Sequence, residues 1–406
     1  MTAYPAWTPA ARPGIIPLRP LSFGTILGRS FSALRQNPRV LLGFAVGVQS
    51  VATFVGTVAI VAVTVASFLR LDTLRPGTPE FDEVAAGSVA VSLITAVVIG
   101  LALGTLGVLV QGVVVSEVAH AAVAEKLTLG ALWARVKPVA WRLVGYTLLV
   151  TLVVLVGIAL VVVGIIALWA AAPAGGIALT IAVVLASLPL GLWLTVKLLL
   201  APAVIILEGA TITGAIRRSW RLTRGRFWST LGIVVIISLV FGAVAQLVSI
   251  PFSFATTAIS TVFSPTGEPQ TGAIVALIVG GVLTQIVTVL LQVVALIAQS
   301  TATALIYIDC RMRHEALDQD LLAYVEQRDA GVRELADPYR QHIGRVAAPR
   351  APLAHPGYGY PPPPGPGYGY PPPPGPGYGY PPPPAGTAAP HDAGDPPARA
   401  TPWVQP

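Results

Sequence analysis

The sequence predicts an all-α protein: a polytopic membrane helix bundle with six spans, short amphipathic helices at the membrane interface, and a disordered Pro/Gly/Tyr-rich tail. Of its 406 residues, 54% are hydrophobic and only 11% are charged, whereas about a quarter of an ordinary soluble domain is charged. The apolar residues form continuous runs and do not alternate with period two, which favours helices over a membrane barrel. This composition excludes a conventional soluble enzyme.

Each of six apolar runs is longer than the roughly 20 residues that a helix needs to cross a bilayer. The runs cover 40–69, 87–116, 143–170, 176–200, 230–262 and 272–308. Pro251 interrupts the fifth run and predicts a kink there, because proline lacks an N–H. We therefore predict four parts, namely a flexible N-terminus (1–17), a six-span membrane domain (18–308), a charged cytoplasmic helical segment (309–345) and a disordered tail (346–406).

The charges between the runs predict the orientation. Basic connections alternate with neutral or acidic ones, and the connection 70–86 holds more acids than bases. Because basic loops stay on the cytoplasmic side, both termini are expected in the cytoplasm. Arg is strongly preferred over Lys, and Ala, Gly, Val and Pro are abundant, which indicates a GC-rich bacterial genome and hence a bacterial plasma membrane.

A short amphipathic segment precedes each odd-numbered run. Arg29-Ser30-Phe31 matches Arg218-Ser219-Trp220 at an offset of 189 residues, and Gly130-Ala131-Leu132 resembles Gly214-Ala215-Ile216 at an offset of 84. The hypothesis is three repeated units, each an interfacial helix followed by two spans; the alternative is that any collar helix has this pattern. In the third segment the expected apolar stripe is Ile216, Trp220 and Phe227.

Several short motifs carry a resemblance to a known family. They are Leu207-Glu208-Gly209, Ala215-Ile216-Arg217-Arg218-Ser219-Trp220, Phe227-Trp228, Leu231-Gly232, the N-terminal 18–24, Tyr307-Ile308-Asp309 and Arg311-Met312-Arg313. Over roughly residues 18–325 the chain resembles the glycerophosphoryl diester phosphodiesterase membrane-domain family, in particular its stand-alone bacterial members. In the fused enzymes of that family a separate soluble barrel performs the chemistry, and this chain has no room for one. The resemblance therefore implies a membrane topology without the enzymatic activity.

The fourth connection is the strongest candidate binding site, for anionic lipid headgroups. Each basic residue near an anionic surface contributes about 1 kcal/mol to binding. The candidate residues are Arg217, Arg218, Arg221, Arg224 and Arg226. The alternative is that these arginines only set the topology.

Polar residues form a stripe on the sixth run. They are Gln285, Thr288, Gln292, Gln299 and Thr303. They either hydrogen-bond to neighbouring spans or line a translocation path. Lys197, near the end of the fourth run, is expected to extend to the headgroups or to pair with Glu117 or Glu208.

Other chemistry is not expected. Glu117 and His120 supply too few ligands for zinc, Cys310 is the only cysteine, and no nucleophile or nucleotide-binding motif occurs. We expect no catalytic residues, no metal, no cofactor and no nucleic-acid partner. The Gly-x-x-x-Gly pairs 43/47 and 100/104 predict close helix packing.

The tail contains three copies of Gly-Tyr-Gly-Tyr-Pro-Pro-Pro-Pro, at 357–364, 367–374 and 377–384. Such a segment cannot bury a core, and it either docks a protein partner or is simply disordered. The leading functional hypothesis is a non-enzymatic integral membrane protein that organises lipids or partner proteins at the cytoplasmic face. The alternatives are a transporter or permease subunit using the stripe, and an enzyme acting on lipid headgroups.

Overall fold

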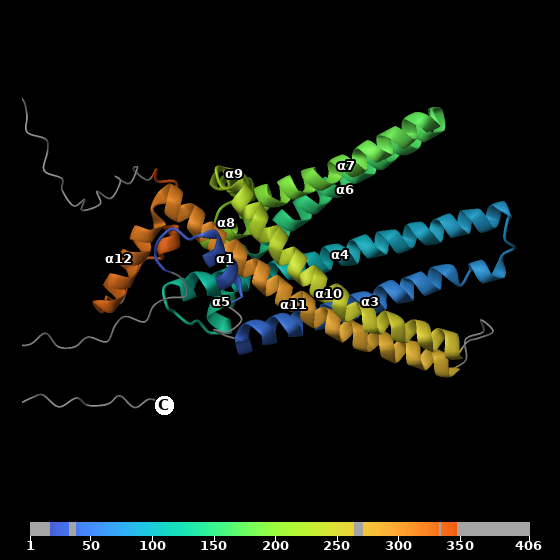
Figure 1. The fold of residues 1–406 in the computed structure, drawn as a ribbon, viewed down its shortest axis with the longest axis horizontal. Coiled ribbons are helices and arrows are strands. Elements are labelled where there is room, and N and C mark those ends of the chain that lie inside the picture. Colours follow the sequence, from blue (N-terminus) through green and yellow to red (C-terminus); the bar gives the residue numbers. More distant parts are fainter. Residues whose placement is uncertain (1–16, 32–37, 264–270, 333, 347–406) are drawn as a thin grey trace, which may run out of the picture. The chain divides into compact units, whose positions relative to one another are not determined.

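The structure, a computed structural model, describes residues 17–31, 38–263, 271–332 and 334–346. Within these residues every regular element is helical and there is no strand, which confirms the predicted all-α class (Figure 1). The helices are α1 (Phe23–Ser30), α3 (Pro38–Phe68), α4 (Pro79–Ala122), α5 (Leu129–Val136), α6 (Ala140–Ala171), α7 (Pro173–Leu198), α8 (Ala201–Glu208), α9 (Ile212–Leu222), α10 (Phe227–Phe263), α11 (Thr271–Glu315) and α12 (Leu317–Asp329). Short 3-10 turns are η1 (Leu71–Thr73), η2 (Lys137–Val139) and η3 (Pro338–Arg340). The predicted tail and the N-terminal residues 1–16 lie outside the described residues.

Six helical stretches are long and apolar enough to cross a membrane, as the sequence predicts. They are Leu41–Phe68, Pro79–Ala122, Leu129–Ala171, Pro173–Glu208, Phe227–Phe252 and Val279–Glu315. The long helices pack as three hairpins, α3 with α4, α6 with α7, and α10 with α11 (Figure 1). One boundary differs from the expectation, because α11 continues past residue 308 to Glu315. Pro251 lies inside α10, which continues through it as one helix, and the predicted kink stays a prediction.

A short capped helix precedes each hairpin. In all three, a hydroxyl side chain caps the first turn by accepting the backbone N–H three residues further on: Ser22 from Thr25, Thr128 from Ala131, and Thr211 from Gly214. Placing the caps in register aligns α1 with α9 at the predicted offset of 189. It aligns α5 with α9 at 83, so the offset of 84 suggested by the Gly-Ala pattern was wrong by one residue. The cap decides the register because it fixes where the helix starts.

The cap register supports the hypothesis of three repeated units, because the same positions are buried in each helix. Counted from the cap, the fourth and eighth residues are buried, namely Ile26 and Ser30, Leu132 and Val136, and Ala215 and Ser219. The seventh residue is an arginine in every unit, namely Arg29, Arg135 and Arg218. Each of the three short helices thus carries an arginine at the same position, counted from its cap.

The buried core gathers where these short helices meet the ends of α4 and α11. We call α1, α5, α8, α9 and α12, together with those two ends, the collar. Helix α8 is buried over Ala201–Leu207, and α11 is buried from Ser300 to Met312. The parts of the hairpins away from the collar expose large apolar side chains such as Leu152, Val163 and Leu185, as expected for surfaces in contact with lipid.

Close helix packing occurs at a glycine that the sequence patterns did not single out. A Cβ built on Gly43, Gly47 or Gly100 would meet nothing within 4 Å, so the Gly-x-x-x-Gly prediction was wrong for these positions. A Cβ on Gly112 of α4 would lie 3.2 Å from Val136 and 3.4 Å from Leu143. Gly112 therefore lets α5 and α6 approach α4.

We expect Gly112→Val to lower the midpoint of thermal unfolding in detergent, because overpacking a tight contact costs about 1–3 kcal/mol. Gly100→Val is the matched control, since its side chain would enter open space on the same helix. Equal midpoints for the two variants would contradict this account of the α4 packing.

Candidate functional site

Arg218 of α9 is buried in the collar between two carboxylates. It forms ion pairs with Glu208 and Glu315, and its Nη2 lies 2.8 Å from Glu315 Oε2. Glu208 ends α8 and Glu315 ends α11, and each is followed by a left-handed residue, Gly209 or Ala316. One arginine therefore joins the ends of two long helical segments to α9.

Arg311 of α11 extends this network. Its Nε donates to Glu315 Oε2 at 2.8 Å and its Nη1 to the Tyr307 hydroxyl at 3.2 Å, while Tyr307 donates to Glu208 Oε1 at 2.7 Å. Arg311 is completely buried and also donates to the carbonyls of residues 339 and 341. With Arg218, the cluster contains two positive and two negative charges, so it is neutral as a whole, which favours its burial. Within the described residues, Arg218 Nη1 is a buried donor without a hydrogen bond.

The charge state of Arg218 follows from its neighbours. Burial alone lowers the pKa of Arg218, but the hydrogen bonds and charges of Glu315 and Glu208 raise that pKa above its ordinary value. Arg218 is therefore a fixed cation that holds the collar together.

Asp309 forms a second buried junction. Its Oδ1 accepts the Leu21 backbone N–H at 2.8 Å and Arg313 Nε at 3.0 Å, and its Oδ2 lies 3.0 Å from Arg226 Nε. Arg313 also donates to the Leu21 carbonyl. This junction connects the segment before α1, the start of α10 and the end of α11.

The structure divides the predicted arginine cluster into two groups. Arg218 and Arg226 are engaged inside the protein, so the candidate lipid contacts narrow to the exposed Arg217, Arg221 and Arg224. The predicted apolar stripe of α9 needs a matching correction. Its buried residues are Ala215, Arg218, Ser219 and Leu222, whereas Trp220 is partly exposed. The polar residues on this face have partners on neighbouring elements. Arg218 pairs with Glu208 of α8 and Glu315 of α11, and Ser219 donates to the Lys197 carbonyl of α7 and accepts the Leu200 backbone N–H.

An open cavity of about 420 Å³ borders the exposed arginines. Arg217 and Arg221 line it together with the Arg218–Glu208 pair. Thr211 and Gly214 from the start of α9, and Ile343 and Gly344, also line it. Arg142 donates to the carbonyl of Gly209, next to this turn, at 2.6 Å. The exposed guanidinium groups of Arg217 and Arg221 can here reach an anion at the surface.

Lys197 has partners other than those expected. Its Nζ donates to Thr223 Oγ1 at 3.4 Å and lies 5.9 Å from the centre of the Trp220 ring. Trp220 in turn packs edge-to-face on Trp193. Glu208, one of the expected partners of Lys197, binds Arg218 instead. The lysine therefore stabilises the contact between α7 and α9.

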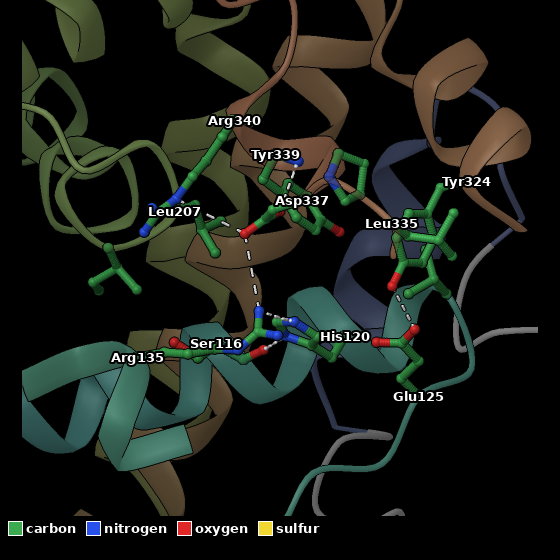
Figure 2. Close-up of a pocket in the computed structure, with 13 residues that line it drawn as sticks. Ser116, His120, Glu125, Arg135, Leu207, Tyr324, Leu335, Asp337, Tyr339 and Arg340 are labelled. Carbon is green, nitrogen blue, oxygen red and sulfur yellow. Dashed lines mark hydrogen bonds and ion pairs between the residues drawn. The ribbon is translucent and has the colours of Figure 1, made fainter. Parts of the chain in front are cut away.

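Another cavity, of about 260 Å³, lies between α4, α5, α8, α12 and the segment 335–340 (Figure 2). At its base, His120 Nδ1 bonds to the Ser116 carbonyl at 2.7 Å, so this nitrogen must carry the proton. The opposite nitrogen then accepts a hydrogen bond from Arg135 Nη1. Histidine in this form is neutral, and it orients Arg135 toward the cavity, as Figure 2 shows.

Two tyrosines close other sides of this cavity. Tyr324 donates to Glu125 Oε1 at 2.7 Å, and Tyr339 donates to the Ala119 carbonyl at 2.8 Å. Burial and the hydrogen bond to Glu125 raise the pKa of Tyr324 to about 12, and burial raises the pKa of Tyr339 strongly. Both phenols therefore stay protonated at physiological pH and act as donors. In the part of the chain that the structure describes, no three His, Cys, Asp or Glu side chains gather into a metal-binding group.

The polar stripe of the sixth span does not act as one surface. Thr288 and Gln292 border a cavity of about 150 Å³ between α10 and α11, whose lining is mainly apolar. Thr303 is buried and donates to the Gln299 carbonyl within its own helix. Gln285 and Gln299 are half-buried. The stripe thus splits between a small cavity and local helix contacts.

The fold and the family comparison together define the class of protein to which this chain belongs. Six apolar spanning helices make the chain a multi-pass integral membrane protein. Residues 21–305 match the family model described as a domain of unknown function, DUF7847. This match covers more than half of the chain, so the protein belongs to that family. No curated protein and no solved structure matches it, and the resemblance to the phosphodiesterase membrane domain stays a prediction.

Proposed function

We propose that this protein is a non-enzymatic membrane scaffold that binds anionic lipid headgroups through Arg217, Arg221 and Arg224 at the cytoplasmic face of a bacterial plasma membrane. The observation that carries the proposal is the division of α9 into two faces. One face is fixed in the collar by Arg218, while the other exposes Arg217 and Arg221 beside an open cavity, and the exposed Arg224 follows directly after the helix. The helix is therefore held in place while its basic side remains available.

Aromatic side chains support a position of the collar at the membrane interface. Trp141 and Trp228, at the starts of α6 and α10, are 84% and 80% exposed. Trp133 and Trp220 on the short helices are partly exposed. Tryptophan is enriched at the headgroup level, so a belt of this kind favours a collar that contacts headgroups. Basic residues at this end favour the cytoplasmic side.

The transporter hypothesis receives less support. The cavity beside Gln292 is small, and its polar members, Ser249, Thr284, Thr288 and Gln292, are accompanied by apolar side chains. Such polar groups within a bundle contribute roughly 0.6 kcal/mol each to helix association. We therefore assign the stripe to helix packing and propose no path along it. Binding of a protein partner by the Pro/Tyr tail also remains part of the proposal.

The test is a triple variant, Arg217→Gln, Arg221→Gln and Arg224→Gln. At about 1 kcal/mol per basic residue, we expect a loss of affinity for phosphatidylglycerol on the order of a hundredfold. Native mass spectrometry of the detergent-solubilised protein measures phosphatidylglycerol adducts against phosphatidylcholine adducts. Arg75→Gln, exposed in the connection after α3, is the control and should retain the selectivity. Unchanged phosphatidylglycerol retention in the triple variant would contradict the proposal.

A further inference from the structure

The repeated units place Arg135 and Arg218 at the same position but in different surroundings. Both are the seventh residue after the helix cap. A glutamate stands three residues before each cap, Glu125 in one unit and Glu208 in the other. Each glutamate accepts a tyrosine hydroxyl at 2.7 Å, from Tyr324 and Tyr307 respectively. The two units thus share an arginine, a glutamate and a tyrosine.

The difference lies in what the arginine binds. Arg218 is 6% exposed and pairs with two carboxylates, whereas the side chain of Arg135 is 46% exposed and faces the 260 Å³ cavity. Its ion pair with Asp337 Oδ2 measures 3.9 Å, well beyond the roughly 2.7–2.9 Å of a strong charge-assisted hydrogen bond. In the described residues the close partner of Arg135 is the neutral His120, where Arg218 has a close carboxylate.

A second arginine faces the same oxygen. Arg340 Nε also lies 3.9 Å from Asp337 Oδ2, and both arginines line the cavity (Figure 2). Asp337 therefore stands between two guanidinium groups without a close bond to either one. The other oxygen of Asp337 accepts the Tyr339 backbone N–H at 3.0 Å, which holds this carboxylate at the rim.

We propose that this cavity is a binding site for a phosphate group, bound between Arg135 and Arg340, and that Asp337 is a resident carboxylate that competes with it. Arginine forks match phosphate oxygens in paired hydrogen bonds. Two arginines on opposite sides suit a tetrahedral phosphate better than a planar carboxylate, because phosphate oxygens point in several directions. The volume is far above the roughly 10–15 Å³ that one water needs.

Neutral His120 has a positioning role in this site. By accepting from Arg135 Nη1 it holds one edge of the guanidinium and leaves the remaining donors for the ligand. The phosphate is carried either by a soluble anion or by a lipid headgroup. The site is separate from the lipid surface of α9 and does not depend on it.

The experiment is calorimetric titration of inorganic phosphate into the full-length protein in phosphate-free detergent buffer, with ionic strength held constant by chloride. We expect saturable binding that weakens about tenfold or more in Arg135→Gln and in the more exposed Arg340→Gln, since each loses a charged hydrogen bond. Asp337→Asn should instead bind phosphate several times more tightly, because it removes the competing charge and keeps the shape. A gain of affinity cannot arise from misfolding.

Arg75→Gln, exposed in the connection after α3 and outside both proposed sites, is the control and should bind phosphate as the wild type does. The lipid test changes other residues, so the two tests fail independently. Repeating the titration in phosphatidylcholine nanodiscs with and without phosphatidic acid identifies the source. Loss of the phosphate signal when phosphatidic acid is present assigns the site to a lipid headgroup, and a retained signal assigns it to a soluble anion. An affinity that is the same in wild type, Arg135→Gln and Arg340→Gln, or that falls in Asp337→Asn, would overturn the proposal.

Discussion

Replacing Glu315 by glutamine should destabilise the protein more than the loss of any other single charge in the collar. Glu315 Oε2 accepts from both Arg218 and Arg311, at 2.8 Å each. The variant keeps the shape of the side chain but leaves two buried arginines to share Glu208. Removing one member of a buried ion pair costs about 3–5 kcal/mol, because the remaining charge has lost its compensation.

The measurement is the midpoint of thermal unfolding in detergent, monitored by tryptophan fluorescence. Glu326→Gln is the matched control, since Glu326 lies exposed on α12 and an exposed charge contributes at most about 1 kcal/mol. If Glu315→Gln unfolds at the same temperature as Glu326→Gln, the buried network does not stabilise the collar.

Asp309→Asn should have the second largest effect, and a more local one. The amide group retains an oxygen for some of the Leu21 and Arg313 hydrogen bonds but loses the charge that pairs with Arg226. Hydrogen bonds to charged groups contribute about 1.5–3 kcal/mol each. Arg226 and Arg313 are partly exposed, so water compensates both of them in part and the loss is smaller than at Glu315.

Hydrogen exchange measured by mass spectrometry distinguishes this local effect from general destabilisation. We expect faster exchange in α1, whose approach to α11 depends on the Leu21–Asp309 bond, with little change in α5. Asp329→Asn on the surface of α12 is the control. Equal exchange in α1 for both variants would show that Asp309 does not fix the N-terminal segment.

The sequence predicted the spans well because continuous apolar runs depend only on the thickness of the bilayer. All six were found, as was a short amphipathic helix before each hairpin. The sixth run was predicted to end at residue 308, whereas α11 ends at Glu315. The prediction was too short because the charges from Asp309 to Glu315 were taken as the end of the helix. These charges instead remain helical because Arg218 and Arg226 come from distant segments to pair with Glu315 and Asp309.

The candidate sites were predicted less completely. An arginine cluster in the sequence does not reveal which members face a carboxylate of another helix, so Arg218 and Arg226 were grouped with the exposed arginines. The residues of the proposed phosphate site were not singled out, because Arg135, Asp337 and Arg340 meet only through tertiary packing. One signal was present in the sequence, namely the equivalent spacing of Glu125 and Arg135 and of Glu208 and Arg218, but the offset of 84 concealed it.

The most direct test of the whole account is the sidedness of the collar. Cys310 is the only cysteine and is buried, so the wild-type chain serves as the blank for labelling with a membrane-impermeant maleimide. Glu80→Cys lies at the start of α4 near the connection after α3, and Glu326→Cys lies on α12, and both positions are exposed. The preparation is bacterial cells whose outer layers have been removed and whose plasma membrane is intact. We expect the maleimide to label Glu80→Cys in these cells directly. Glu326→Cys should be labelled only after the plasma membrane is permeabilised. Labelling of Glu326→Cys in intact cells, with Glu80→Cys protected, would contradict the account.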